Sequence, residues 1–283
     1  MRFGTIAHKV LEYRYPPGLK RGPASSLLWE QFFEAELKEA MAGGFRDDDG
    51  TWEELGETGD LLFAAYDAQY GADEDWFVIS AEQKFKVRIA PGLFYVGTID
   101  GVWRHRPTKR LHYAEHKTTG DIWTKHLGLD EQGSSYWTYG EGWLKKRRII
   151  KPEETLHAII YNFLRRARPD ERPTNAAGQS LNKNGKVSER QPSPLFARLP
   201  VHREQIARDN LHHRVLGQAQ EMEAIRRGDA QALKAPSRFT CLGCPFRDPC
   251  EMHEVGADYE LLLRTSYEQH DPYSQYELNQ DGK

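Results

Sequence analysis

Residues 93–117 read LFYVGTIDGVWRHRPTKRLHYAEHK, and the expected fold is built around this stretch. Both of its halves are rich in β-branched and aromatic residues, and Arg106-Pro107-Thr108 between them has the composition of a turn. The pattern therefore predicts two neighbouring antiparallel strands, Leu93–Arg104 and Arg110–Lys117. Such strands would bring residues near their ends close together in space.

Outside this stretch the pattern changes from strands to helices in both directions. A further strand is predicted over Phe77–Ile89, before the turn Ala90-Pro91-Gly92, and an apolar strand over Leu156–Leu164. Apolar residues at helical spacing predict helices over Ile6–Tyr13, Ser25–Ala42, Thr51–Tyr70, Glu131–Arg148 and Val201–Gly228. We therefore expect an α/β fold, a mixed central sheet flanked by helices.

The sequence shows no internal repeat and no boundary that would divide it into independent domains. We expect a single domain over residues 1–269, with a helical part at 1–75, a strand-rich core at 76–164, a basic loop at 165–200, and a helix with a cysteine cluster at 201–269. A polar tail would follow at 270–283. The basic loop holds five prolines and few apolar residues, so it is predicted to lie outside the core.

Composition excludes several classes of protein. The chain has 283 residues, is 39% hydrophobic and contains seven Trp, which is enough to bury a large core. No apolar run approaches the roughly 18 residues of a membrane span, and the first residues lack a signal-peptide pattern. We expect a cytoplasmic protein with no membrane partner.

The net charge of −3 conceals an asymmetry along the chain. Residues 47–75 are strongly acidic, whereas residues 145–190 carry twelve Lys and Arg against five acids. Such runs are often only solvated surfaces, but a polyanion would suit the basic half. The candidate DNA contacts are Lys145, Lys146, Arg147, Arg148, Arg165, Arg166, Lys183 and Lys186.

The predicted strand pair places three chemically useful residues together. Asp100 lies near the end of one strand, and Glu115 and Lys117, two residues apart, project from one face of the next. Two carboxylates can hold Mg²⁺, the backbone carbonyl of His116 can add a ligand, and Lys117 can orient an attacking water. Taken alone, the motif is explained more simply by a surface salt bridge between Glu115 and Lys117.

Two further segments place the motif in a family context. Gly4-Thr5-Ile6-Ala7-His8-Lys9-Val10-Leu11-Glu12 resembles the G-x-x-x-H-x-x-x-E helix of RecB-like nucleases of the PD-(D/E)XK superfamily, and Gln132-Gly133-Ser134-Ser135-Tyr136 resembles their Q-x-x-x-Y element. Over residues 1–260 the chain is similar to the CRISPR-associated iron–sulfur exonucleases and to related proteins of actinobacterial phages. The resemblance implies a restriction-endonuclease-like core, a Mg²⁺ or Mn²⁺ site and DNA as substrate.

The resemblance also implies roles for individual residues. His8, Asp100 and Glu115 would bind the metal, Lys117 would be the catalytic lysine, and Gln132 and Tyr136 would support the active site and the DNA. Without this context, His8 would be read as a structural histidine and Tyr136 as part of an aromatic core.

Cys241, Cys244 and Cys250 are too few and too close together for a disulfide framework. They resemble the carboxy-terminal part of the iron–sulfur nucleases, in which a fourth cysteine upstream completes a [4Fe–4S] cluster. That cysteine is absent here, because the sequence begins almost at the His8 helix. His253, His202 or an outside ligand would have to complete the cluster; structural Zn²⁺ and three unliganded thiols are the alternatives.

These observations together predict a Mg²⁺- or Mn²⁺-dependent deoxyribonuclease, with exonuclease action expected on linear or single-stranded ends, in DNA recombination, repair or phage DNA processing. A recombination or replication protein would be its partner. Two alternatives remain: a catalytically inactive nucleic-acid-binding accessory protein that retains the nuclease fold, and a hydrolase of a small phosphorylated molecule, for which the sequence offers no Gly-rich phosphate loop.

Overall fold

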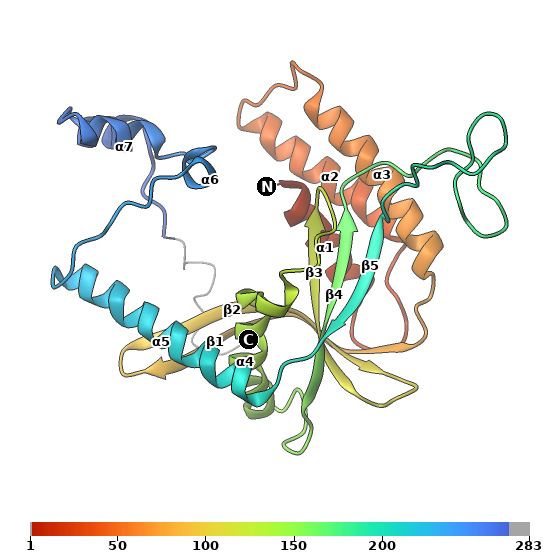
Figure 1. The fold of residues 1–283 in the computed structure, drawn as a ribbon, viewed down its shortest axis with the longest axis horizontal. Coiled ribbons are helices and arrows are strands. Elements are labelled where there is room, and N and C mark those ends of the chain that lie inside the picture. The colour runs from red at the N-terminus through yellow and green to blue at the C-terminus, as the bar shows by residue number, and fades with distance from the viewer. Residues whose placement is uncertain (1, 272–283) are drawn as a thin grey trace. The chain divides into compact units, whose positions relative to one another are not determined.

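A computed structural model describes residues 2–271 (Figure 1), so most of the predicted polar tail, 270–283, lies outside the described residues. The fold is α/β, with a five-stranded mixed sheet flanked by helices. The strands are β1 (Trp76–Ala90), β2 (Leu93–His105), β3 (Leu111–Thr119), β4 (Leu156–Arg165) and β5 (Phe196–Val201). The helices are α1 (Arg2–Arg14), α2 (Ser25–Ala42), α3 (Thr51–Tyr70), α4 (Glu131–Lys146), α5 (Gln205–Arg227), α6 (Arg238–Cys241), α7 (Arg247–Glu254) and α8 (Tyr259–Ser266), with a 3₁₀ turn, η1, at Leu127–Leu129.

The strands lie in the sheet in their chain order, β1-β2-β3-β4-β5. The pairs β1–β2, β2–β3 and β4–β5 are antiparallel. Short turns join the first two pairs, whereas the long segment 166–195 joins β4 to β5. β3 and β4 are parallel, and α4 provides the crossover between them that a parallel pair requires. The predicted strand pair is confirmed, and its register joins Gly101 to Ala114.

One face of the sheet packs against α1, α2 and α3. The buried residues of α1, among them Phe3, Ile6, Val10 and Leu11, recur every three or four positions, as expected for a helix that buries one side. They join Trp29, Phe63 and Trp103 in a continuous apolar core. Truncating a fully buried Trp to Ala costs about 3–5 kcal/mol, so this aromatic core holds the amino-terminal helices on the sheet.

The other face is covered by α4. The ring of Tyr136 packs against Phe85, Tyr95 and Tyr113, and a Cβ at Gly97 would lie 2.6 Å from that ring. Glycine therefore allows the tyrosine to approach the strand closely. Asp130 caps α4 by accepting a hydrogen bond from the Gly133 N–H, which fixes where the helix begins.

Strand β5 is absent from the prediction, because 196–200 lie in the stretch expected to be a polar loop and Val201 is the expected start of the following helix. That helix, α5, begins instead at Gln205. Strand β5 forms an outer edge of the sheet and contains Pro200, which lies opposite Ile160 of β4. Proline is tolerated on an edge strand because its missing N–H leaves no neighbour unpaired. At the opposite edge, β1 carries one short bridge, between Val78 and Gly18.

The chain separates into two compact units, residues 1–213 and residues 214–283. The first contains the whole sheet and α1 to α4. The second contains the end of α5, α6, α7 and α8, with several apolar side chains exposed, such as Phe239 and Leu242. Among the described residues, no helix has the length and apolar character needed to cross a membrane.

Candidate metal centre

Helix α1 places His8 next to the sheet. Gly4, His8 and Glu12 share one stripe of α1, and a Cβ at Gly4 would lie 3.1 Å from Thr118 Oγ1, so the helix approaches the end of β3 closely. His8 Nδ1 lies 3.4 Å from the Oδ1 of Asp100 on β2. The other Asp100 oxygen, Oδ2, accepts a 2.7 Å hydrogen bond from the His116 backbone N–H. The structure thus brings the His8 helix to the predicted strand pair that carries Asp100 and His116.

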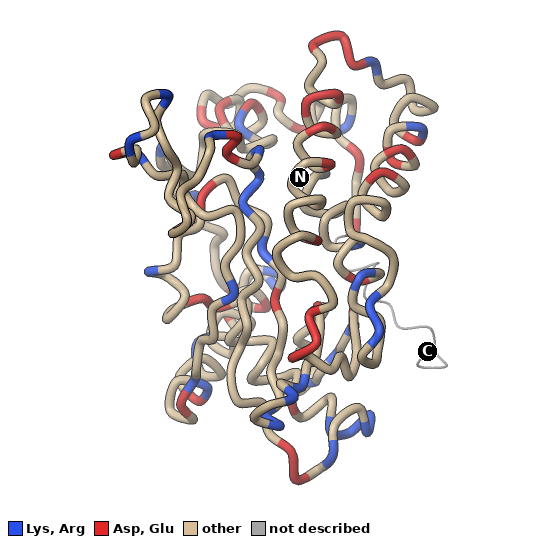
Figure 2. The backbone as a smooth tube through the Cα atoms, turned by 90° about the vertical axis from the view of Figure 1, so that its right-hand side faces the viewer, with Lys and Arg blue, Asp and Glu red and all other residues tan. Residues whose placement is uncertain are grey.

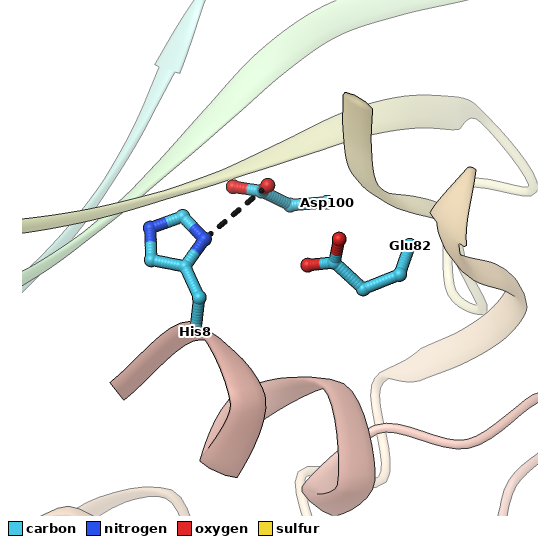
Figure 3. Close-up of side chains that lie close together, drawn as sticks. All are labelled: His8, Glu82 and Asp100. Carbon is cyan, nitrogen blue, oxygen red and sulfur yellow. Dashed lines mark ion pairs between the residues drawn. The ribbon is translucent and has the colours of Figure 1, made fainter. Parts of the chain in front are cut away.

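Glu82 completes this group, and sequence reasoning missed it. Ligand atoms of His8, Glu82 and Asp100 lie within 4.8 Å of one another (Figure 3), the only such trio found among residues 2–271. The neighbours of Glu82 pair with Gly101 and Ile99, so the register places Glu82 opposite Asp100. Counting back from the Ala90-Pro91-Gly92 turn does not give this pairing, because Ala90 pairs with Leu93 and the register shifts by one residue between Arg88 and Ala90.

The backbone at Glu82 is unusual, because its φ is +41°. A left-handed conformation costs a non-glycine residue of the order of 1 kcal/mol and is found disproportionately at functional sites. The side-chain alternation of β2 changes at the same level. Ile99 contacts α4 at Gly140, whereas Trp103, four residues on, packs in the core of α1 to α3. This irregularity lets Glu82 and Asp100 share one space with His8.

Glu115 and Lys117 form the second half of the site. Lys117 Nζ lies 2.7 Å from Glu115 Oε1 and donates a 2.5 Å hydrogen bond to Gln132 Oε1 at the start of α4. The Tyr113 hydroxyl donates to the other Glu115 oxygen. Glu115 is buried but stands beside the trio rather than within it. The salt bridge that the motif alone suggested is present, yet it is half-buried and adjoins the metal-ligating group.

The Q-x-x-x-Y element lies where its spacing predicts. Gln132 and Tyr136 are four residues apart on one side of α4, and Gln132 Nε2 lies 3.4 Å from the Tyr136 hydroxyl. Gln132 therefore links Lys117 to the aromatic packing around Tyr136. Trp137 is a core residue whose indole N–H donates to Glu141, and Tyr139 packs on Tyr95.

The His116 ring lies edge to face with the His8 ring, at 6.1 Å between centroids, and belongs to a buried polar network. Its Nδ1 lies 3.0 Å from the Asn162 amide nitrogen, and Asn162 Oδ1 accepts a hydrogen bond from Arg198 Nε. Burial lowers the pKa of His116 to about 3, so its ring is neutral. Arg198 also donates to Asp73 and Tyr15, which balances its buried charge.

The charges at the site are tightly opposed. Burial lowers the pKa of His8, but the hydrogen bond and charge of Asp100 outweigh it and raise the value to about 9. Burial and the charge of Asp100 raise the pKa of Glu82 to about 8, and the same two causes raise that of Glu115 to about 7 despite Lys117. Burial also opposes the charge on Asp100, yet the hydrogen bond from His8 keeps its pKa below the ordinary value.

These shifts describe a site with more negative charge than the chain itself neutralises, so protons take up the excess. One imidazole nitrogen and several carboxylate oxygens converging on one space suit a divalent cation such as Mg²⁺ or Mn²⁺. The donor set therefore fits the metal that the sequence analysis expected, with Glu82 added to the ligands considered there.

Several of the predicted DNA contacts have partners within the protein. Lys145 forms a 2.8 Å ion pair with the buried Glu141, and the Arg165 guanidinium donates to the carbonyls of Ser193 and Pro194. Arg147 lies over the Trp143 ring. These three side chains therefore stabilise the fold, whatever else they do.

Four of the other predicted contacts, Lys146, Arg148, Lys183 and Lys186, are exposed. Arg166 is exposed as well and lines a cavity of about 320 Å³ with Gly4, Thr118 and Thr119. The two threonines follow Lys117 directly in β3. Figure 2 shows that acidic residues, in contrast, gather at the turn between α2 and α3. A basic side chain beside the candidate centre is thus available for a phosphate.

The three cysteines belong to the second unit. Cys241 ends α6, Cys250 lies in α7, and Cys244 lies between these helices; all three are free thiols. His253 Nδ1, one suggested fourth ligand, lies 3.0 Å from Lys234 Nζ, and His202 Nδ1, the other, lies 3.0 Å from the His157 carbonyl. Metal binding by the cysteines stays a prediction.

Comparison with known proteins adds no family assignment, because no protein-family model and no curated protein sequence matches the chain.

Proposed function

We propose that this protein is a metal-dependent deoxyribonuclease with a RecB-like PD-(D/E)XK core, acting on linear or single-stranded DNA ends. One observation carries the proposal: the His8, Glu82 and Asp100 group lies directly beside the Glu115–Lys117 pair. An acidic metal-binding group next to a held lysine is an arrangement that phosphodiester hydrolysis can use.

Each residue has a distinct task in this reaction. His8, Glu82 and Asp100, with Glu115 adjacent, would hold a Mg²⁺ or Mn²⁺ ion, which would supply positive charge to polarise the scissile phosphate. Lys117, fixed by Glu115 and Gln132, orients the attacking water and offsets the negative charge that develops on the phosphate. Tyr113 holds Glu115 in place, and Arg166 binds a flanking phosphate.

Cleavage of end-labelled linear DNA and of a closed circle, with Mg²⁺, Mn²⁺ or EDTA, tests the proposal. Wild-type protein should degrade linear DNA only with metal, and circles should survive if the action is exonucleolytic. Asp100→Ala should abolish cleavage and weaken Mn²⁺ binding in calorimetry, whereas Asp48→Ala, which removes an exposed carboxylate, should change neither.

Lys117→Ala separates catalysis from binding. It should leave DNA and Mn²⁺ binding nearly unchanged and reduce cleavage by about a hundredfold or more, as expected for loss of a group that stabilises the transition state. If wild-type protein binds DNA but cuts under none of the metal conditions, the protein is an accessory factor and the nuclease proposal fails.

For the cysteines we propose a structural metal, either a [4Fe–4S] cluster or Zn²⁺. The absorption spectrum of protein purified without oxygen distinguishes the two, because an iron–sulfur cluster gives a broad band near ~400 nm and zinc gives none. Protein that contains neither metal would show that the three thiols are unliganded.

A further inference from the structure

A second cavity of the first unit, of about 310 Å³, contains an unusual set of side chains. Four histidines line it, His105, His112, His157 and His202, together with Arg110 and Trp76. We call it the histidine pocket. It is built from the β2–β3 turn, the start of β4 and the end of β5, and none of its lining residues belongs to the candidate metal centre.

The histidine rings form a connected row. The ring centroids of His112 and His157 are 5.6 Å apart, and those of His157 and His202 are 4.7 Å apart. Three of the rings have one nitrogen anchored: His105 Nδ1 by Thr108 Oγ1 at 2.9 Å, His202 Nδ1 by the His157 carbonyl at 3.0 Å, and His157 Nε2 by Arg110 at 2.7 Å. Anchoring fixes the ring orientation and leaves the other nitrogen of each ring for a further partner.

One side-chain nitrogen of His112, a residue that lines the pocket, has no hydrogen-bond partner. The residue is only 6% exposed, and its Nδ1 is buried without a hydrogen bond. A buried imidazole nitrogen without a partner is costly, so such groups normally meet a ligand or water. Burial, and then the neighbouring histidines and Arg110, lower the pKa of His112 to about 4, so its ring is neutral.

The surrounding charges favour an anion over a metal cation. The titratable side chains that line the pocket are the four histidines, Arg110 and Arg198, and no carboxylate is among them. Arg110 donates toward His157 Nε2 and would repel a cation there. Within residues 2–271, three metal-ligand atoms lie close enough together only at His8, Glu82 and Asp100, not in this row.

We propose that the histidine pocket binds the phosphate of a phosphate monoester. The Arg110 guanidinium and the imidazole N–H groups would donate to the phosphate oxygens, and Trp76, Ile160 and Pro200 form an apolar wall for the organic part. Nucleoside monophosphates and the phosphorylated ends of DNA strands both offer this chemistry. The site stands independently of the proposed nuclease activity, because binding needs neither the metal centre nor cleavage.

Isothermal titration calorimetry in EDTA tests the pocket with inorganic phosphate, a nucleoside 5′-monophosphate and the unphosphorylated nucleoside. The monophosphate should bind and the nucleoside should not. Arg110→Gln and His157→Gln should each weaken binding about tenfold or more, as expected for loss of a charge-assisted hydrogen bond. Lys109→Gln removes a charge from the same turn but does not line the pocket, so it should leave binding unchanged.

Two further arms identify the source of the phosphate. A short oligonucleotide with a 5′-phosphate, compared with its 5′-hydroxyl form, shows whether a strand end enters the pocket, and the free monophosphate shows whether a small molecule suffices. Thermal unfolding of each variant confirms that it is folded. The proposal is overturned if folded wild-type protein binds no phosphate compound at millimolar concentration, or if Lys109→Gln weakens binding as much as Arg110→Gln.

Discussion

At the scale of single residues, Glu82 is the most informative side chain of the candidate centre. Its left-handed backbone is strained, and its raised pKa shows that the site disfavours its ionised form. The fold therefore holds this carboxylate in place at a cost in stability. Glu82→Gln should weaken Mn²⁺ binding about tenfold or more, because an amide oxygen is a poorer ligand than a carboxylate. Calorimetric titration measures this, with the exposed Glu153→Gln as control. Equal affinities in both variants would remove Glu82 from the ligands.

Burial of His112 should make the free energy of unfolding depend on pH. The histidine's pKa of about 4 in the folded protein lies below the ordinary value of 6.5, so the unfolded chain takes up the proton first. The contribution of the neutral His112 ring to the free energy of unfolding is therefore fully present above pH 6.5. It is lost as the pH falls toward 4, at up to about 1.4 kcal/mol per pH unit. Denaturant unfolding at several pH values should show a shallower loss for His112→Phe than for the wild type. Parallel curves would contradict the assignment.

Part of the candidate centre is predictable from the sequence, and the rest is not, for a physical reason. Asp100 and Glu115 were expected to be close because their strands were recognised, and the resemblance supplied His8. Glu82 was missed because it lies within an ordinary-looking strand, and its role depends on a local irregularity in β1 and β2. Histidines spread from 105 to 202 gave no linear motif, so the histidine pocket appears only in the fold.

At the scale of elements, the contact between α2 and α3 depends on glycine. A Cβ at Gly59 of α3 would lie 1.9 Å from the Trp29 ring, whose N–H also donates to the Gly56 carbonyl. Gly59→Ala should therefore destabilise the protein by about 1–3 kcal/mol or more, since the ring must move. Gly142→Ala in α4, where a Cβ meets nothing within 4 Å, should be stabilising by up to about 1 kcal/mol.

Denaturant unfolding of both glycine variants measures these free energies directly. A loss of stability in Gly142→Ala equal to that in Gly59→Ala would show that the contact with Trp29 is not what makes Gly59 necessary. The helices themselves were predictable, because α2 and α3 have the limits that their apolar spacing indicates. β5 was not, because a six-residue strand containing proline is defined by its pairing with β4 rather than by its composition.

For the molecule as a whole, the net charge of −3 does not predict its affinity for DNA, which depends on which basic side chains are exposed and unpaired. Arg166 is exposed beside the candidate centre, whereas Arg168 is paired with Glu57 at 2.7 Å. Arg166→Gln should lower the slope of log binding constant against log salt by about 1, the loss of one phosphate contact. Arg168→Gln should change it less. Fluorescence anisotropy with labelled DNA over a salt series gives both slopes, and identical slopes in the wild type and Arg166→Gln would exclude the contact.

The division into two units also concerns the molecule as a whole. The sequence pattern predicts one domain over residues 1–269, and the boundary between the two units, at residues 213 and 214, falls within α5. All residues of the candidate centre and of the histidine pocket lie in the first unit. Cys244→Ser should accordingly leave Mn²⁺ affinity at the His8 centre unchanged in calorimetry, and a tenfold loss would contradict this separation.

The ends of the sheet have a consequence for how the protein behaves at high concentration. A sheet edge with free N–H and C=O groups can template another strand and start aggregation. Here β5 is short and interrupted by Pro200, and the opposite edge carries exposed Lys84, Lys86 and Arg88 in alternation along β1. A strand from a second copy would meet a missing donor at one edge and a row of positive charge at the other. The sheet thus resists edge-to-edge polymerisation into fibrils while its faces stay packed by helices.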